Sequence, residues 1–166
     1  LSESVTPEEV TYIMNRALTA QQSAVSKFSG AVDKYIGDAM MAIFGAPLDL
    51  EDHEDKALEC AKQIALNMEE LNVEFGARGL PPIKIGIGIN SGEAIVGNMG
   101  SEQRFDYTAI GDAVNIAARL ESGTKAAGVD VLIGASTQQR TSIDLKALPA
   151  IEAKGKAEKL KVYTFK

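Results

Sequence analysis

The stretch AVDKYIGDAMMAIF, residues 31–44, consists of two short apolar-rich runs on either side of Gly37 and Asp38. Glycine and aspartate are preferred in tight turns, and two apolar runs joined by two such residues predict a β-hairpin. The second run, residues 40–44, contains only apolar residues, so we expect it to be deeply buried, with its methionines in the core. The hairpin is therefore the starting point for the prediction of the fold.

Helical patterns flank this hairpin on both sides. Thr6 is a candidate N-cap, with Pro7 at the first helical position and Glu9 completing a capping box. The apolar stripe that follows stops near Gly30. After the hairpin, the acidic residues 49–55 lead into a second helix. One face of this helix is apolar and comprises Leu58, Ala61, Ile64, Ala65, Met68, Leu71 and Phe75.

Strand and helix patterns alternate in the rest of the chain. Strict alternation of isoleucine predicts a strand at residues 83–89, followed by a second strand at 94–96 and a Gly/Ser-rich loop. Gly111 and Asp112 open a third helix that runs to about residue 122, with Asp112 as a candidate cap. Downstream, the patterns predict a strand at 129–133, a short helix at 136–141 and a C-terminal hairpin that ends with residues 161–165.

The predicted order of elements, α-ββ-α-ββ-α-β-α-ββ, indicates an α+β fold. A chain of 166 residues is long enough for one domain with a substantial core, so we predict that residues 1–166 form a single domain. Sheets of this kind usually open with a central strand, and a missing inner strand leaves unpaired backbone groups. We therefore expect the first strand of the domain to precede Leu1.

Composition excludes several classes of function. The net charge is −6 and no Lys/Arg tract is present, which argues against nucleic-acid binding. No apolar run approaches the ~20 residues of a membrane helix, and no signal peptide is visible. Cys60, the single cysteine, is expected to be a buried thiol. We expect a cytoplasmic domain without membrane contact of its own, free-standing or within a larger or membrane-anchored protein.

Polar residues form a stripe along the third predicted helix. Asn115 and Arg119 are four residues apart and share one face, which Ser122 continues. Taken alone, this pattern also fits a solvated helix face. The tetrapeptide Ile-Gly-Asp-Ala occurs twice, at residues 36–39 and 110–113, where it also fits turn and helix-start chemistry.

Longer motifs decide between these readings. Residues 33–47 and 105–121 closely resemble the signatures of the class III adenylyl cyclase catalytic domain of bacterial type, within the adenylate/guanylate cyclase family. Residues 1–4 resemble the segment after that family's first strand, and 154–156 resemble its phosphate-binding hairpin. The resemblance covers the whole chain and implies a ferredoxin-like, palm-type βαββαβ core with extra C-terminal elements, lacking its first strand in this chain.

The resemblance also implies a substrate. Lys34 and Thr108 match the residues that read the purine. Adenine presents an acceptor at N1 and a donor at its amino group, which suit a lysine donor and a threonine hydroxyl acceptor. Guanine reverses both, and related guanylyl cyclases carry an acidic residue where Lys34 stands. The resemblance therefore implies ATP, which the domain would convert to 3′,5′-cyclic AMP and pyrophosphate.

The remaining site residues follow from the same matches. Asp38 matches a ligand of Mg²⁺ or Mn²⁺, of which the family site holds two ions. Asn115 matches the residue that orients the ribose, Arg119 the residue that stabilises charge on the transferring phosphorus, and Lys154 the residue that holds the terminal phosphates. The reaction implied is two-metal-assisted, in-line attack of the ribose 3′-hydroxyl on the α-phosphorus.

The family's active sites lie between two domains. Asp38 is expected from one chain and the other five residues from its partner, which implies a homodimer with two shared sites. The family's second metal-binding aspartate is expected on the strand before Leu1, so we expect metal binding by this chain to be weakened. That expectation leaves open a second reading, a catalytically impaired nucleotide-binding or dimerisation module.

Three other signals are discounted. Diguanylate cyclases have a related fold, but their acidic Gly-Gly-acid-Glu-Phe hairpin is not found in this sequence. His53 lies among acidic residues at a predicted helix start, where negative charge is favoured, and we read it as structural. No helix directly follows the glycines of residues 86–100, so we expect turn and packing roles for them rather than a dinucleotide-binding loop.

Overall fold

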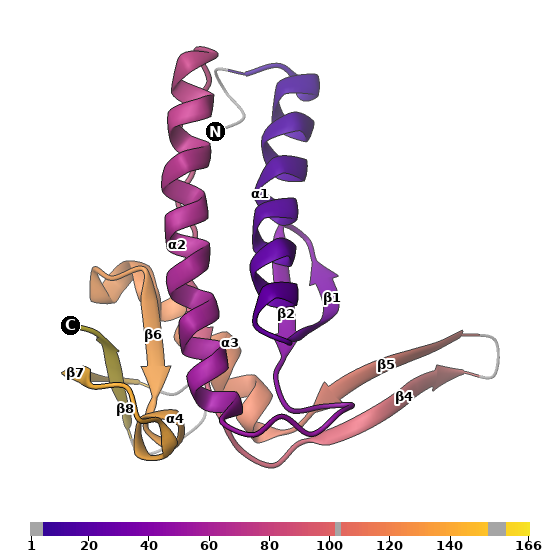
Figure 1. Cartoon of the computed structure of the whole chain (residues 1–166), viewed down its shortest axis with the longest axis vertical. Coiled ribbons are helices and arrows are strands. Elements are labelled where there is room, and N and C mark those ends of the chain that lie inside the picture. Colours follow the sequence, from indigo (N-terminus) through magenta and orange to yellow (C-terminus); the bar gives the residue numbers. More distant parts are fainter. Residues whose placement is uncertain (1–4, 102–103, 153–158) are drawn as a thin grey trace.

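The computed structural model describes residues 5–101, 104–152 and 159–166, with the side chains of residues 98–108 outside the described set. Two long helices, α1 (Pro7–Lys27) and α2 (His53–Ala77), lie side by side and form the tall part of the molecule (Figure 1). Their facing sides bury an apolar core that includes Ile13, Phe75 and Cys60. Cys60 is buried, as predicted, and this burial raises the pKa of its thiol to about 11.

The predicted start of α1 is confirmed. Thr6 is the N-cap, and its hydroxyl accepts a hydrogen bond from the Glu9 N–H at 3.1 Å. The Glu9 carboxylate in turn accepts from the Thr6 N–H at 2.9 Å, and Pro7 occupies the first helical position. This reciprocal pair satisfies two of the backbone donors that a helix start leaves without partners.

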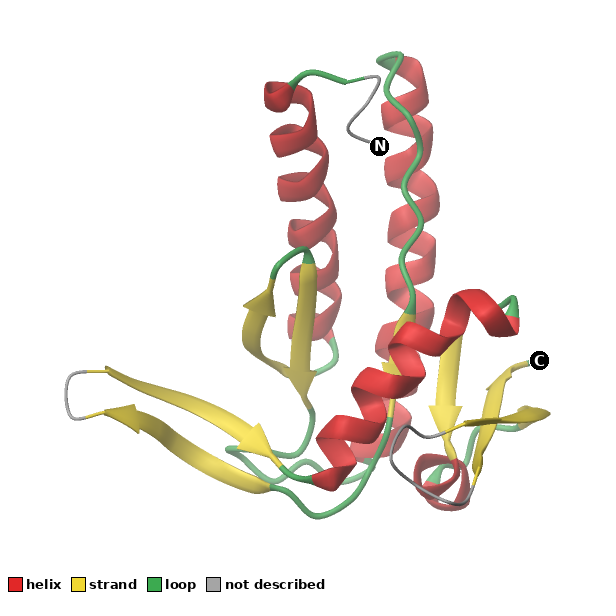
Figure 2. Cartoon of the chain, turned by 180° about the vertical axis from the view of Figure 1, so that it is seen from behind, coloured by secondary structure: helices red, strands yellow, loops and turns green. Residues whose placement is uncertain are grey.

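The predicted hairpin is formed by β1 (Ala31–Ile36) and β2 (Ala39–Ile43), which are antiparallel. Gly37 adopts φ +60 in the two-residue turn, a value that favours glycine. Figure 2 shows this hairpin beside α1. The prediction of deep burial for the second run is wrong, because most of β2 is only half-buried. Met40 packs against the core, but within the described residues β2 pairs only with β1.

A four-stranded mixed sheet forms the second part of the molecule. Its strand order is β3 (Ile87–Ile89), β6 (Val131–Gly134), β8 (Lys159–Phe165) and β7 (Leu145–Glu152). β3 and β6 are parallel, and the other neighbours are antiparallel. The short helix α4 (Ala135–Arg140) follows β6. The predicted α+β class is therefore confirmed.

Helices cover both faces of this sheet. On one face, Leu58 and Ala61 of α2 pack with Val131 and Ile133. On the other face, α3 (Asp112–Ala127) contributes Leu120 to a cluster with Leu132 and Val162. Alternate residues of β6 thus contact different helices, as the two-residue period of a strand requires.

The strand predicted at residues 83–89 begins later, at Ile87, where β6 provides a partner. Before that point the Asn72 side chain holds the backbone instead. It accepts from the Ile83 N–H and donates to the Ile83 carbonyl, both at 2.9 Å. The predicted alternation nevertheless holds, since Ile83, Ile85 and Ile87 all pack against the core between the helices.

Two predictions on either side of Gly111 are corrected. The strand predicted at 94–96 is longer: β4 (Ile95–Ser101) pairs along its length with β5 (Arg104–Ile110), and the two project from the body of the molecule as an arm (Figure 1). The third helix starts with Asp112 as its first residue and Gly111 as its N-cap, so Asp112 is not the cap. It continues to Ala127, where Gly128 ends it with φ +73.

Candidate active site

The tip of the β1–β2 hairpin presents one carboxylate to the outside of the molecule. Asp38 is exposed at the turn, and Lys34 is exposed on β1, where it lies opposite Met41 in the strand register. Ile36, next to the turn, is 59% exposed.

Thr108 lies on β5, opposite Gly97 of β4. Its side chain lies outside the described set. β5 contacts β1, the strand that carries Lys34. The strands that carry Lys34 and Thr108, the two residues expected to contact the purine, are therefore neighbours within one chain.

Asn115 and Arg119 lie on α3, where Asn115 is exposed and Arg119 half-buried. The same helix buries Leu120 and Thr124. A helix turns by about 100° per residue, so Thr124 points nearly opposite to Asn115. The predicted polar face is thus directed away from the chain's own sheet.

Glycines on the segment leading into and through β3 allow α3 to lie directly on the backbone. A Cβ atom added at Gly88 would lie 2.3 Å from the Ala117 carbonyl oxygen and 2.4 Å from the Glu121 nitrogen. One added at Gly86 would lie 2.2 Å from the Thr124 hydroxyl. Packing roles expected for these glycines are therefore confirmed, and they set the distance between α3 and β3.

The structure groups the expected residues only in part. Asn115 and Arg119 share a face of α3, and Lys34 and Asp38 share the hairpin. Figure 2 shows the hairpin tip at the middle height of α1, whereas the first turn of α3 lies near the bottom of the view, beside the base of the β4–β5 arm. One chain therefore does not bring the hairpin tip and the start of α3 together. Lys154 lies outside the described residues.

The hairpin offers a single carboxylate at its tip, Asp38, to the metal expected there. Among the residues that the structure describes, no three His, Cys, Asp or Glu side chains are grouped closely enough to hold an ion. Mg²⁺ in nucleotide sites is usually bound by one or two carboxylates, with water and substrate phosphates as its other ligands. Asp38 fits that mode of binding, as one ligand of an ion shared with a nucleotide, and does not fit a site made by protein alone.

His53 is the first residue of α2, and its Nε2 lies 3.0 Å from the Glu54 carboxylate. Its ring also packs close to Gly45, at the end of the hairpin. These contacts place it at a helix start, as predicted.

Among the described helices, none combines the length and the apolar character needed to cross a bilayer.

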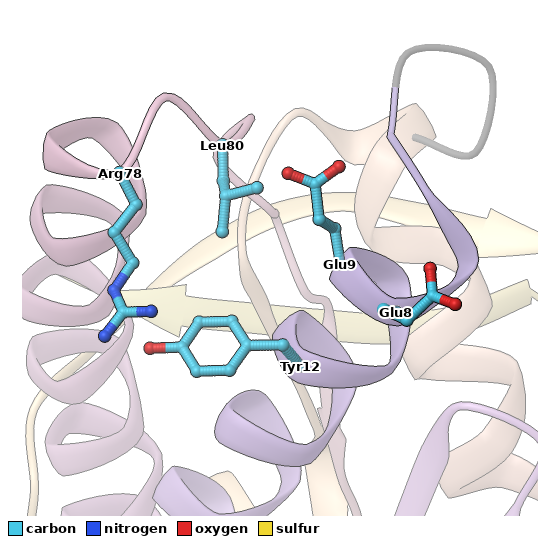
Figure 3. A pocket seen from close by; sticks show the side chains of 5 residues that line it. All are labelled: Glu8, Glu9, Tyr12, Arg78 and Leu80. Atoms are coloured by element: carbon cyan, nitrogen blue, oxygen red, sulfur yellow. The ribbon is translucent and has the colours of Figure 1, made fainter.

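One hollow in the described surface lies elsewhere. It measures about 440 Å³ and lies between the start of α1 and the end of α2, lined by Glu8, Glu9, Tyr12, Arg78 and Leu80 (Figure 3). The Arg78 guanidinium, the cation that lines this hollow, lies over the Tyr12 ring at 4.7 Å and so already has a partner in the chain. None of the described residues expected to act on a nucleotide lines it.

Comparisons with known proteins agree with the motifs. The family model for the adenylate and guanylate cyclase catalytic domain matches residues 1–166. An adenylate cyclase of Anabaena cylindrica is 35% identical over 179 aligned residues, which cover 100% of this chain and 34% of the relative. The chain thus spans about a third of that relative's length.

Two crystal structures share the fold along almost the whole chain. The guanylyl cyclase Cya2 superposes with a TM-score of 0.88 at 30% identity, covering 98% of this chain and 82% of that one. The adenylyl cyclase CyaB from P. aeruginosa gives 0.84 at 31% identity, covering 98% and 84%. The palm-like α+β fold implied by the motifs is therefore confirmed, and the chain belongs to the adenylate and guanylate cyclase catalytic domain family.

Proposed function

We propose that this domain converts ATP to 3′,5′-cyclic AMP and pyrophosphate. Family membership supports a nucleotidyl cyclase, and the Anabaena cylindrica relative bears the name adenylate cyclase. The overall fold does not choose the base, because guanylyl and adenylyl cyclases superpose on the chain about equally well. The choice between ATP and GTP therefore rests on individual side chains.

Lys34 is the observation that carries the choice of ATP. It is an exposed cation on β1, and its strand contacts β5, which carries Thr108 opposite Gly97. An ammonium group only donates hydrogen bonds, which suits N1 of adenine and not the protonated N1 of guanine. A threonine hydroxyl accepts from the adenine amino group but can also donate to the guanine carbonyl, so the discrimination rests on Lys34. The wrong base leaves polar groups unpaired, which is costly once they are desolvated.

The other residues act on the ribose and the phosphates. Asn115 would orient the ribose, so that the 3′-oxygen lies in line with the α-phosphorus and the leaving oxygen. Arg119 would stabilise the negative charge that develops on the α-phosphoryl oxygens. Lys154 would hold the terminal phosphates. A new bond forms between the 3′-oxygen and the α-phosphorus, the bond to the β-phosphate oxygen breaks, and the 3′-hydroxyl proton is lost to water.

Asp38 would hold Mg²⁺ or Mn²⁺ together with the substrate phosphates. When bound, the ions supply neutralisation of phosphate charge and lower the pKa of the 3′-hydroxyl. We name no side-chain general base, because a hydroxyl activated in this way can release its proton to solvent.

A homodimer with shared sites completes this arrangement. The hairpin tip and the first turn of α3 lie apart in one chain, and Asp38 and Asn115 are both exposed. A second copy related by a two-fold axis would bring the tip of one chain to the α3 of the other, twice. Residues 1–166 would act as one domain in each copy.

A nucleotide-binding or dimerisation module without turnover is the second candidate. The observation that favours it is that Asp38 is the one carboxylate at the hairpin tip, and that the described residues provide no group of three metal ligands. Such a module would keep contacts to the base and ribose but lack the charge neutralisation that the reaction needs.

Activity and binding separate the two candidates. The full gene product that carries this chain is incubated with ATP or GTP and Mn²⁺, and cyclic nucleotides are quantified by mass spectrometry. Cyclic AMP in large excess over cyclic GMP supports the proposal. Absence of both products, with ATP binding retained in calorimetry, supports the binding module instead. Absence of both products and of binding contradicts the cyclase and the nucleotide-binding module, and leaves only a dimerisation module.

A further inference from the structure

Asn90 is the residue directly after β3, and its side chain connects two helices. The amide nitrogen donates to the Ala113 carbonyl in the first turn of α3 at 3.0 Å. The amide oxygen accepts from the Ser136 hydroxyl, on α4, at 2.9 Å. Sequence patterns did not single out this residue, because one asparagine at a strand end is ordinary turn chemistry.

The surrounding groups fix the orientation of this amide. A backbone carbonyl only accepts hydrogen bonds, so the nitrogen of the Asn90 amide must face Ala113. The Ser136 hydroxyl, on the other side, shares its single hydrogen between the Asn90 amide oxygen and the Ser91 carbonyl oxygen, which lies 2.6 Å away. Gly134 leaves the space, since a Cβ atom there would lie 2.3 Å from the Asn90 oxygen. The side chain is thus held from several directions.

The N-cap of α3 does not hold the helix through a side chain. This N-cap residue, Gly111, has no side chain and forms no side-chain cap hydrogen bond. The Asn115 N–H bonds only within this first turn, to the Gly111 carbonyl at 3.2 Å. Asn90 therefore supplies a side-chain anchor from outside the helix, two residues before Asn115.

A second restraint acts one turn further along α3. Gly88 lies against the backbone of Ala117 and Glu121, at the close distances described above. Both residues point away from the face that carries Asn115, given about 100° per residue. Two residues therefore hold α3 on the side opposite Asn115. Gly88 does so by direct contact, and Asn90 by its hydrogen bond to Ala113.

We propose that Asn90 is a positioning residue for the nucleotide site: its hydrogen bond to Ala113 fixes the first turn of α3 and thereby the placement of Asn115. This inference rests on the proposed cyclase function. It predicts that removing the bond impairs the reaction more than it impairs substrate binding, because reaction in line tolerates little misplacement.

Asn72 provides a matched control. Like Asn90, it is a half-buried asparagine with two side-chain hydrogen bonds, here both to the backbone of Ile83. It joins α2 to the segment before β3 and contacts no expected site residue through these bonds. Asn72→Ala therefore removes the same chemistry at a place where only stability is expected to change.

The experiment measures kcat and KM for ATP, together with the melting temperature, for Asn90→Ala and Asn72→Ala in the full gene product. We expect Asn90→Ala to lower kcat by roughly 10- to 100-fold with KM changed less than about threefold. Asn72→Ala should leave kcat within about twofold while lowering the melting temperature to a similar extent. Equal kcat losses in the two variants would overturn the proposal.

Two further variants exclude a general structural effect. Asn90→Asp keeps the size and the acceptor for Ser136 but loses the donor to Ala113, so kcat should fall at least as far as in Asn90→Ala. In an Asn115→Ala background, Asn90→Ala should change kcat by less than about twofold, because the two residues act as a unit. Multiplicative losses would contradict positioning through Asn115.

A separate readout distinguishes failure of this inference from failure of the proposed function. If the unmodified protein makes no cyclic nucleotide, the cyclase proposal fails. Amide hydrogen exchange over residues 113–117 then tests the positioning alone. Faster exchange there in Asn90→Ala than in Asn72→Ala supports the anchor, and equal exchange in the two variants refutes it.

Discussion

Replacing Gly88 by alanine tests the close packing of α3 against the backbone of β3. The added Cβ would lie 2.3 Å from the Ala117 carbonyl oxygen and 2.4 Å from the Glu121 nitrogen, whereas ordinary contact begins near 3.4 Å. Both neighbours are backbone atoms, so no side chain can rotate away and α3 must move by about 1 Å. Overpacking of this kind costs roughly 1–3 kcal/mol, and we expect the upper half of that range.

A loss of that size is measurable in two ways. For a domain of this length, roughly 2–4 °C of melting temperature is lost per kcal/mol, so Gly88→Ala should melt about 5–10 °C lower. Displacement of α3 should also reduce kcat by roughly 10²-fold. Urea denaturation should show a lower midpoint with an unchanged slope.

Gly76→Ala is the matched control for this substitution. Gly76 lies within α2 near its end, and a Cβ atom there would meet nothing within 4 Å. Alanine is the better helix former, so this variant should gain about 0.5 kcal/mol. If Gly88→Ala proves as stable and as active as the unmodified protein, the close packing of α3 on β3 is refuted.

Three further predictions concern stability, rate and specificity. Hydrogen bonds from the side chains of Ser142 and Thr141 lower the pKa of Asp55. The ionised Asp55 therefore stabilises the fold above its unfolded pKa near 4, and this stabilisation is lost as the pH falls through its folded pKa. Asp55→Ala should cost about 1 kcal/mol at pH 7 in urea denaturation, and the difference should shrink at pH 3; a difference that grows on acidification would contradict this. Arg119→Ala should lower kcat by roughly 10²-fold or more with a smaller effect on KM in steady-state assays, and a pure KM effect would exclude the assigned role. Lys34→Glu combined with Thr108→Cys should shift preference toward GTP in a competition assay, and an unchanged ratio of products would show that other residues read the base.

Local chemistry made several elements predictable. The start of α1 followed from three residues, and the β1–β2 hairpin from the pair Gly37-Asp38 between two apolar runs. Both depend on contacts within a few residues. The extent of other elements depends on distant partners. β3 starts only where β6 offers pairing, and the backbone at Ile83 is held by Asn72, eleven residues away, which no periodicity reveals.

The candidate site was predictable to a similar degree. Motifs supplied the candidate residues, and the structure places Asn115 and Arg119 on one face of α3. The anchor through Asn90 could not be predicted, because it depends on a hydrogen bond across 23 residues to Ala113. The length of the β4–β5 arm was not predicted, because glycines along it weaken the sequence pattern of a strand. In the structure, pairing between β4 and β5 forms the strands despite these glycines.

Mixing two inactive variants tests the shared site directly. Asp38→Asn and Arg119→Ala are each expected to abolish most activity, and in a shared-site homodimer they damage opposite sides of each site. Co-folding equal amounts makes about half of the dimers mixed, each with one undamaged site, so cyclic AMP formation should return to about a quarter of the unmodified rate. A mixture no more active than the separate variants, although mixed dimers are present, would contradict a site built from two chains.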